Sequence, residues 1–233
     1  MLTKDKIKFL RSLHTKAGRS ASGLFIAEGE KLTTELKALM TICQEYRVGR
    51  DCTVEQMGRI SALKTPTSVL STFYIPEVNS AESYTQRGRV LVLDGVQDPG
   101  NVGTILRTAD WFGVRRVVCS AHTADAFGGK VVQATMGAIG RLEIIYTDIA
   151  EWLKEREKHF PATIYGTFLE RSEPLSGIEI DRDATIVVGN EGQGISSEVE
   201  KLVARRVVIE RGEGGSGESL NVAVAAAIIL AKC

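Results

Sequence analysis

The residues best suited to chemistry lie in three short segments that each follow an apolar stretch, and the first begins at Asp94. Its residues DGVQDPGN lead to Asn101, and a helical pattern that contains Arg107 comes next. Asn101 can simply cap that helix. Arg107 has apolar neighbours in the sequence, and because an unpaired buried charge is costly, it requires an anionic partner or access to solvent. A surface ion pair would satisfy it as well as a ligand would.

The second segment is GNEGQGIS, in which an apolar stretch ends at Gly189 and a carboxylate, Glu191, follows among glycines. Glycine adopts backbone angles that other residues resist, and it lets a ligand approach the main chain closely. The order G-x-x-G-x-G differs from the dinucleotide fingerprint and comes late in the chain, so a nicotinamide site is disfavoured. A tight turn explains the glycines, but it does not explain the carboxylate.

The third segment is ERGEGGSGESLN, a glycine-rich loop that leads through Ser219 and Asn221 into an apolar stretch. It lacks the lysine of a phosphate-binding P-loop. Ser219 can cap the following helix, and the loop can be a plain connector. Asn221 is harder to explain, because a buried amide needs hydrogen-bond partners.

The elements that would position these segments predict an α/β fold. Apolar runs without polar alternation recur in the last two thirds of the chain, and helical patterns separate most of them, which is typical of a parallel sheet covered on both faces. Such sheets bind ligands beyond the carboxyl ends of their strands. Strands are predicted at 90–93, 114–119, 142–146, 162–168, 186–188 and 207–209, and helices at 102–112 and 220–231.

The first third of the chain is predicted to form a separate small α/β domain, residues 1–79. Helical patterns over 4–14, 29–40 and 54–61 alternate with strand patterns over 24–27, 41–46 and 69–75. The polar stretch that follows has no apolar run to bury. We therefore place a linker at 80–88 and the second domain at 89–233.

Charge, cysteines and hydropathy limit the possible partners. The 29 basic and 29 acidic residues cancel, so any nucleic-acid footprint must be local. The candidate is a basic N-terminal stretch that is opposed only by Asp5, although a solvated helix face explains it about as well. Four scattered cysteines and three histidines predict neither a zinc site nor disulfides. No apolar run could span a membrane, and a cytoplasmic protein is expected. The basic residues of the stretch are Lys4, Lys6, Lys8, Arg11, Lys16 and Arg19.

Taken in order, N-V-G-T-I-x-R-T-A, G-N-E-G-x-G and S-L-N-V-x-V-A resemble the three signature motifs of the SpoU (TrmH-type) RNA ribose 2′-O-methyltransferases of the SPOUT superfamily. The resemblance covers roughly 89–233, and three motifs in the correct order are highly specific. The segment KFLRSLHTKAGRSASGLFIAEGE resembles, more loosely, the substrate-binding domain of members that act on ribosomal RNA.

This resemblance implies transfer of a methyl group from S-adenosyl-L-methionine to a ribose 2′-hydroxyl of structured RNA, with ribosomal RNA favoured over transfer RNA. It implies a SPOUT-type parallel-sheet domain with a C-terminal trefoil knot, preceded by an L30e-like domain. It also implies a homodimer formed through the knotted region, and no metal. The alternatives are a tRNA 2′-O-methyltransferase and a non-catalytic RNA-binding protein that retains the fold.

Residue roles follow from the same resemblance. Arg107 matches the arginine proposed to activate the ribose hydroxyl with help from an RNA phosphate. Because an arginine pKa is about 12.5 or higher, we expect it to hold phosphate and hydroxyl together, while proton abstraction stays open. The active-site matches are Asn101, Glu191, Ser219 and Asn221, and the cofactor-binding matches are Gly189, Ile209 and Leu220, with Thr167 a further candidate.

The sequence departs from the family pattern in the third motif. Glu210 occupies a position where proline is usual, and Ala223 replaces a frequent serine. The loop 211–217 is also richer in glycine and slightly longer than usual. We therefore expect this loop to be mobile in the free protein and to become ordered when the cofactor binds.

Overall fold

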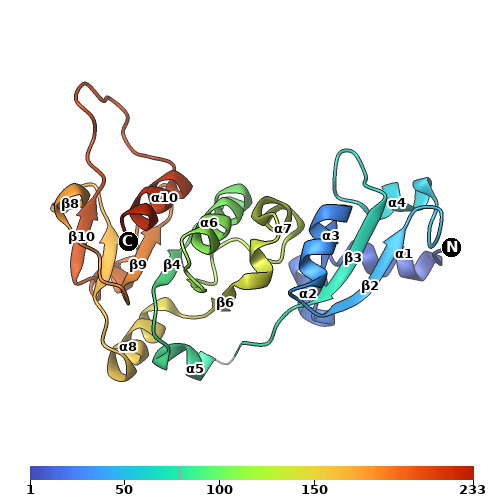
Figure 1. Ribbon diagram of the computed structural model, residues 1–233, viewed down its shortest axis with the longest axis horizontal. Helices are drawn as coiled ribbons and strands as arrows, with labels where there is room; N and C mark the ends of the chain where they lie inside the picture. Colours follow the sequence, from blue (N-terminus) through green and yellow to red (C-terminus); the bar gives the residue numbers. More distant parts are fainter. Residues whose placement is uncertain (79) are drawn as a thin grey trace. The chain divides into compact units, whose positions relative to one another are not determined.

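The computed structural model describes residues 1–78 and 80–233, which form two compact units. The first unit comprises Met1–Glu77 and Asp125–Arg141, and the second comprises Val78–Ala124 and Leu142–Cys233. Figure 1 shows the elements of both units. Asn79, where we placed the end of the first domain, lies outside the described residues.

The first unit is built on an antiparallel sheet with the strand order β1-β3-β2. Alternate residues of β1 face opposite sides, so Leu24 and Ile26 join the core beneath α1 and α4, while Phe25 packs against Phe73 and Phe127 on the other side. The bounds are α1 Lys4–Ser12, α2 Lys16–Ser22, β1 Leu24–Glu28, α3 Glu30–Lys37, β2 Ile42–Arg47, α4 Val54–Ile60, β3 Val69–Tyr74, α7 Gly129–Thr135 and η1 Ala138–Arg141.

Residues 125–141, which the sequence places in the second domain, pack within the first unit. Arg19 donates to the Asp125 carboxylate from Nε at 3.0 Å, and its side chain is buried. Gln133 donates to the backbone oxygen of Glu28 at 2.7 Å. Arg19 is therefore a structural ion-pair residue, and it drops out of the basic stretch proposed to contact nucleic acid.

The second unit contains an all-parallel sheet with the strand order β6-β5-β4-β9-β7-β10-β8, which confirms the predicted parallel α/β architecture. Both central strands, β4 and β9, are buried along their whole length. The strands span β4 Val90–Asp94, β5 Arg116–Cys119, β6 Glu143–Tyr146, β7 Ile164–Thr167, β8 Glu173–Pro174, β9 Thr185–Gly189 and β10 Arg205–Val208.

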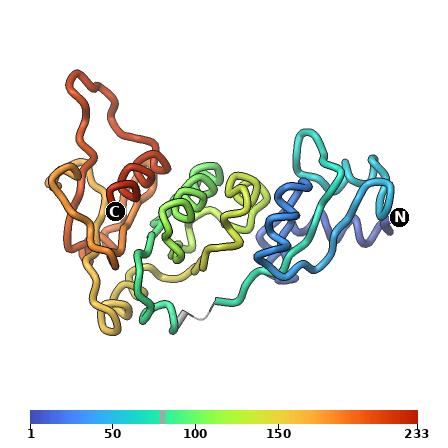
Figure 2. Tube along the Cα trace, in the orientation of Figure 1, coloured from blue at the N-terminus to red at the C-terminus, as the bar shows by residue number. Residues whose placement is uncertain are grey.

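Helices cover both faces of this sheet (Figure 1). Val90 and Val92 of β4 pack toward α8 and α9, and α6 and α10 pack together over the other face. Figure 2 shows the long loop between β10 and α10 extending away from both elements. The bounds are α5 Ser80–Thr85, α6 Pro99–Trp111, α8 Ile149–His159, η2 Leu175–Gly177, α9 Ser197–Glu200 and α10 Val222–Lys232.

The segment expected to be a linker contains the short helix α5, which α8 holds in place. Trp152 donates from its indole nitrogen to the Ser83 hydroxyl at 2.8 Å. Arg156 is 2% exposed, and burial lowers the pKa of Arg156 to about 10. Its guanidinium donates to four backbone oxygens at 3.2–3.4 Å, those of Ser83, Tyr84, Gln86 and Gly88. These contacts come from a distant helix, so the polar pattern of 80–88 gave no sign of them.

Neither a membrane-spanning helix nor a disulfide bond is present in the part of the chain that the structure describes. No helix within the described ranges is long and apolar enough to cross a membrane. All four cysteines are free thiols. The trefoil knot, the L30e-like fold of the first unit and the cytoplasmic location stay predictions.

We expect Arg156→Met to lower the free energy of unfolding by about 2–4 kcal/mol, because four backbone oxygens, buried or partly buried, lose a charged donor. Urea denaturation followed by tryptophan fluorescence measures this change. Lys154→Met, on the exposed side of the same helix, is the matched control and should change the free energy by less than about 0.5 kcal/mol. Equal stability of the two variants would show that Arg156 does not hold α5.

Candidate functional site

The three segments singled out in the sequence meet through one chain of side-chain hydrogen bonds. Asn101, in the first turn of α6, donates from Nδ2 to Glu191 Oε1 at 2.8 Å. Asn221, at the start of α10, donates from Nδ2 to Asn101 Oδ1 at 2.9 Å. These residues lie 90 and 120 positions apart in the sequence. The fold therefore brings one polar residue from each segment into a continuous network.

Local turns leave the Asn101 side chain available for this network. Asp98 is the N-cap of α6 and accepts the Asn101 backbone N–H at 2.8 Å, so the capping role that the sequence left open for Asn101 belongs to Asp98. The sequence D-P-G carries this signal, because proline is favoured directly after a capping aspartate. Asn221 is itself the N-cap of α10 and accepts from Ala223 at 2.9 Å. Asn221, not Ser219, thus caps this helix.

The loop after β9 is fixed against the end of β4 by two residues to which the sequence analysis gave no role. Asn190 donates to the backbone oxygen of Gly95 at 2.8 Å. Asp94 accepts from the backbone N–H of Ser196 at 2.8 Å. A Cβ at Gly189 would lie 2.3 Å from the carbonyl carbon of Gly194, so this turn requires glycine. Both Asn190 and Asp94 adjoin a strand end, and that position was the available signal.

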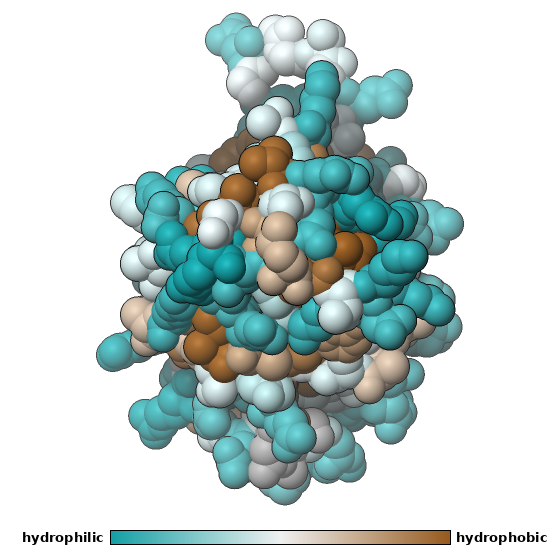
Figure 3. All heavy atoms as spheres, turned by 90° about the vertical axis from the view of Figure 1, so that its right-hand side faces the viewer, coloured by the Kyte–Doolittle hydropathy of each residue, from teal (hydrophilic) through white to brown (hydrophobic). Residues whose placement is uncertain are grey.

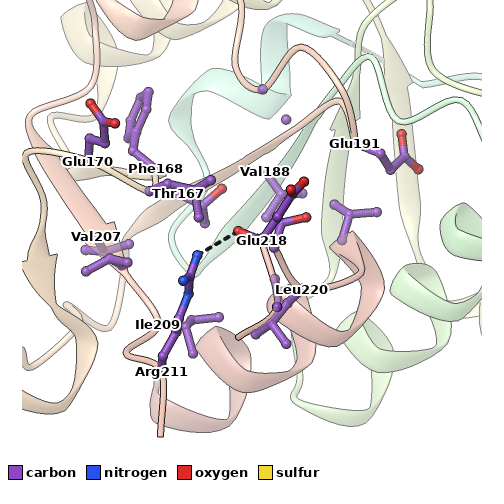
Figure 4. Close-up of a pocket in the computed structure, with 18 of the residues that line it drawn as sticks. Thr167, Phe168, Glu170, Val188, Glu191, Val207, Ile209, Arg211, Glu218 and Leu220 are labelled. Carbon is purple, nitrogen blue, oxygen red and sulfur yellow. Dashed lines mark hydrogen bonds between the residues drawn. The ribbon is translucent and has the colours of Figure 1, made fainter. Parts of the chain in front are cut away.

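These loops border a cavity of about 710 Å³, within the range of about 300–1,000 Å³ typical of small-molecule sites. Figure 4 shows apolar side chains from several strand ends around it, among them Val188. Of the predicted cofactor and active-site residues, the cavity is lined by Thr167, Gly189, Glu191, Ile209, Ser219 and Leu220. The lining does not include Asn101, Asn221 or Arg107, and Glu191 joins the polar network to the cavity.

The cavity combines apolar surface with an excess of carboxylates. Its two arginines already have partners: Arg206 pairs with Glu200, and Arg211 donates to the backbone oxygen of Glu218 at 3.0 Å, the dashed contact of Figure 4. The carboxylates in its lining are those of Glu170, Glu191, Glu210 and Glu218. Such a lining suits a ligand with an apolar ring system and a positively charged centre.

Glu210, which replaces the usual proline, anchors the start of the glycine-rich loop. It accepts hydrogen bonds from the backbone N–H of Ser176 at 3.1 Å and from the Ser176 hydroxyl. These bonds hold the pKa of Glu210 below its usual value. The residues that follow, 211–219, are all exposed. One end of the loop is therefore fixed by a side chain instead of by proline, and the rest has little packing.

Arg107 is exposed on the outward face of α6. Its guanidinium has no hydrogen bond or ion pair in the part of the chain that the structure describes. Access to solvent thus satisfies its charge, and the ion pair that the sequence left open is absent from the described residues. One turn further along the same helix, Trp111 is 84% exposed.

Comparisons with known proteins agree with this geometry. The model of the SpoU rRNA Methylase family matches residues 88–231. The chain is 31% identical to the 23S rRNA (guanosine(2553)-2′-O)-methyltransferase RlmP of Bacillus subtilis, over 97% of this chain and 94% of that protein.

Two solved structures share the whole architecture. One, from Porphyromonas gingivalis and assigned to the TrmH family of RNA methyltransferases, is 36% identical with a TM-score of 0.90, and covers 100% of this chain and 98% of its own. The other is an AdoMet-bound rRNA methyltransferase from Sinorhizobium meliloti, which is 25% identical with a TM-score of 0.89 and covers 100% of this chain and 95% of its own. Sequence, fold and cavity therefore agree that the chain belongs to the SpoU rRNA methylase family.

Proposed function

We propose that this chain transfers a methyl group from S-adenosyl-L-methionine to a ribose 2′-hydroxyl of ribosomal RNA. The observation that carries the proposal is the hydrogen-bonded network of Asn221, Asn101 and Glu191, which joins the three signature motifs at the edge of one cavity. The names of the Bacillus and Sinorhizobium relatives, both rRNA methyltransferases, favour ribosomal RNA over transfer RNA.

The cavity suits the cofactor in size and charge. S-adenosyl-L-methionine supplies a methyl group on a positively charged sulfur, so the transfer needs no metal to activate the leaving group. Gly189 is the last residue of β9, and Ile209 and Leu220 lie near the two ends of the loop between β10 and α10. All three line the cavity, and their main-chain groups would hold the cofactor. Thr167 borders the cavity from the end of β7. The carboxylates in the lining favour a cation, and the apolar side chains favour an adenine ring.

Arg107 would act on the RNA and not on the cofactor, because it lies outside the cavity lining. A ribose hydroxyl is a poor nucleophile at neutral pH, so its oxygen must be aligned and its developing negative charge stabilised. A free guanidinium can donate to a phosphate and to a hydroxyl oxygen at the same time. Asn101, Glu191, Ser219 and Asn221 would shape the adjoining polar edge.

A homodimer would complete the site. Outward residues of α10 form an apolar stripe, in which Val224 is 47% exposed and Ile228 is 38% exposed, and Trp111 is exposed on the neighbouring α6. Such a face is costly to leave in water and suits a second copy of the chain. Arg107 lies outside the cavity lining of its own chain, so in such a dimer Arg107 of the partner subunit would act on the RNA beside this cavity.

The proposed function predicts that the wild-type protein transfers tritiated methyl groups from S-adenosyl-L-methionine to unmodified 23S rRNA transcribed in vitro. Mapping of 2′-O-methyl groups identifies the nucleotide, and a tRNA pool tests the alternative substrate. Calorimetric titration with S-adenosyl-L-methionine is the companion measurement. A folded protein that binds RNA but neither binds the cofactor nor transfers a methyl group would be the non-catalytic alternative.

Arg107→Ala should lower kcat by about 100-fold or more, as removal of one donor to a developing oxyanion typically does. Its affinity for S-adenosyl-L-methionine should stay within about threefold of wild type, because Arg107 lies outside the cavity lining. Arg115→Ala is a matched control, since Arg115 is also exposed but pairs with Asp110. Near-normal turnover by Arg107→Ala would remove Arg107 from the mechanism.

Mixing two inactive variants tests the shared site. Leu220→Arg places a positive charge in the cavity, while Arg107→Ala leaves the cavity intact. If Arg107 acts across the dimer, random exchange of equal amounts should restore roughly a quarter of wild-type activity, because half of the dimers then contain one complete site. A mixture that stays inactive after exchange, verified by mass spectrometry, would show that Arg107 acts within its own chain.

The glycine-rich loop should become ordered on cofactor binding. Amides of 211–217 are expected to exchange rapidly with deuterium in the free protein and more slowly with S-adenosyl-L-methionine, because this exposed segment gains further contacts when the cavity is filled. Amides of β4, which is buried in the sheet, provide the internal control. Equal exchange of the loop with and without the cofactor would contradict the expectation.

A further inference from the structure

The first unit has a cavity of its own, of about 510 Å³, where the carboxyl-terminal ends of α1 and α4 meet. Its lining contains two arginines, a histidine and no carboxylate, although acidic and basic residues are equal in number over the whole chain. The lining residues are Arg11, His14, Gly58, Arg59, Ile60, Ser61 and Ala62. The cavity is therefore a local concentration of positive charge on a chain with no net charge.

Hydrogen bonds from the interior fix the backbone that forms one wall of this cavity. Glu28 is only 6% exposed, and its carboxylate accepts from the backbone N–H of Ala62 at 2.9 Å and from the Ser61 hydroxyl. His14 donates from Nε2 to the backbone oxygen of Ile60 at 2.6 Å. The buried Glu28 carboxylate is thus bound to the turn at 60–62, and the turn is held in one conformation.

Arg11 and Arg59 are exposed, and neither guanidinium has a hydrogen bond or an ion pair within residues 1–78 and 80–233. Acidic residues do occur on the same two helices, at Asp5 and Glu55, but no ion pair joins them to these arginines. By contrast, Arg50 in the same unit pairs with an aspartate and a glutamate. The two guanidiniums at the cavity therefore keep their full capacity to bind an anion.

The backbones of α1 and α4 do not contribute to anion binding at this cavity. Both α1 and α4 direct their carboxyl-terminal ends toward the cavity, and a helix carries partial negative charge at that end. Those ends favour arginine side chains but repel anions. Anion binding must therefore come from the guanidiniums, whose paired N–H groups match the oxygens of a phosphate. Figure 3 views the molecule from the side where α1 and α4 lie in Figure 1, and hydrophilic side chains cover most of that face.

We propose that this cavity binds a backbone phosphate of the RNA substrate, with Arg11 and Arg59 as the donors. The inference rests on the proposed function, because it takes RNA as the substrate. A protein without net charge can bind nucleic acid only through such local contacts. The contact would position the RNA without reading its sequence, since phosphates are the same at every nucleotide.

The test compares the double variant Arg11→Gln, Arg59→Gln with wild type in filter binding to unmodified 23S rRNA transcribed in vitro. We expect the dissociation constant to rise about tenfold near physiological salt. The slope of log K against log salt should become shallower by roughly 1, the value for one lost phosphate contact. In methylation assays KM for the RNA should rise, while kcat at saturating RNA and the affinity for S-adenosyl-L-methionine stay unchanged.

A matched control removes the same charge from other positions of the same unit. Lys31→Gln, Arg50→Gln changes an exposed lysine on α3 and an arginine that acidic residues already neutralise, and it should bind RNA within about twofold of wild type. Arg11→Lys, Arg59→Lys should keep the salt slope, because the charge is retained. Circular dichroism verifies the fold of each variant.

The outcomes separate this inference from the proposed function. If wild type methylates the RNA and the Arg11, Arg59 double variant shows unchanged affinity and salt slope, the phosphate site is wrong and the methyltransferase proposal stands. If the double variant and the Lys31, Arg50 control lose RNA affinity equally, the loss reflects the total positive charge of the protein. The proposed phosphate site is then also wrong. If wild type neither binds nor methylates ribosomal RNA, both proposals fail.

Discussion

The amide of Asn101 is the contact on which the site depends. An amide offers both an acceptor oxygen and donor hydrogens, so this side chain can accept from Asn221 and donate to Glu191 at once. Its own backbone is held by Asp98, which leaves the side chain free for that double task. The first turn of α6, the loop after β9 and the start of α10 are thereby fixed relative to one another, and the cavity lies beside the point where they meet.

Sheet topology explains why these segments come together. The chain runs outward from β4 through β5 to β6 on one side, and β9 then pairs with β4 on the other side. At such a change of direction the loops diverge and leave a crevice beyond the strand ends. Asn190 bridges that junction by its bond to Gly95, and Asp94 bridges it by its bond to Ser196. Beyond the ends of β4 and β9, these side-chain hydrogen bonds hold the two loops together where the backbone pairing of the strands stops.

Sequence patterns predicted the parallel sheet because its central strands are apolar along their whole length, as in β4 and β9. They also predicted which segments would meet, since each of the three follows an apolar stretch. They missed β8, which has two exposed residues, and α5, which depends on Arg156 from a distant helix. They could not show that Arg107 points to solvent, because a helical pattern with apolar neighbours does not say which face an arginine occupies.

The return of residues 125–141 to the first unit has an evolutionary consequence. The polypeptide passes from one unit to the other three times, so no single cut separates two intact halves. A gene fusion or exchange at one point would separate Asp125 from its partner Arg19, and Phe127 from its partner Phe25. Recombination that moved this amino-terminal unit onto another catalytic domain would have to carry a matching helical insert. The two units are therefore expected to have been inherited together and to have diverged as a pair.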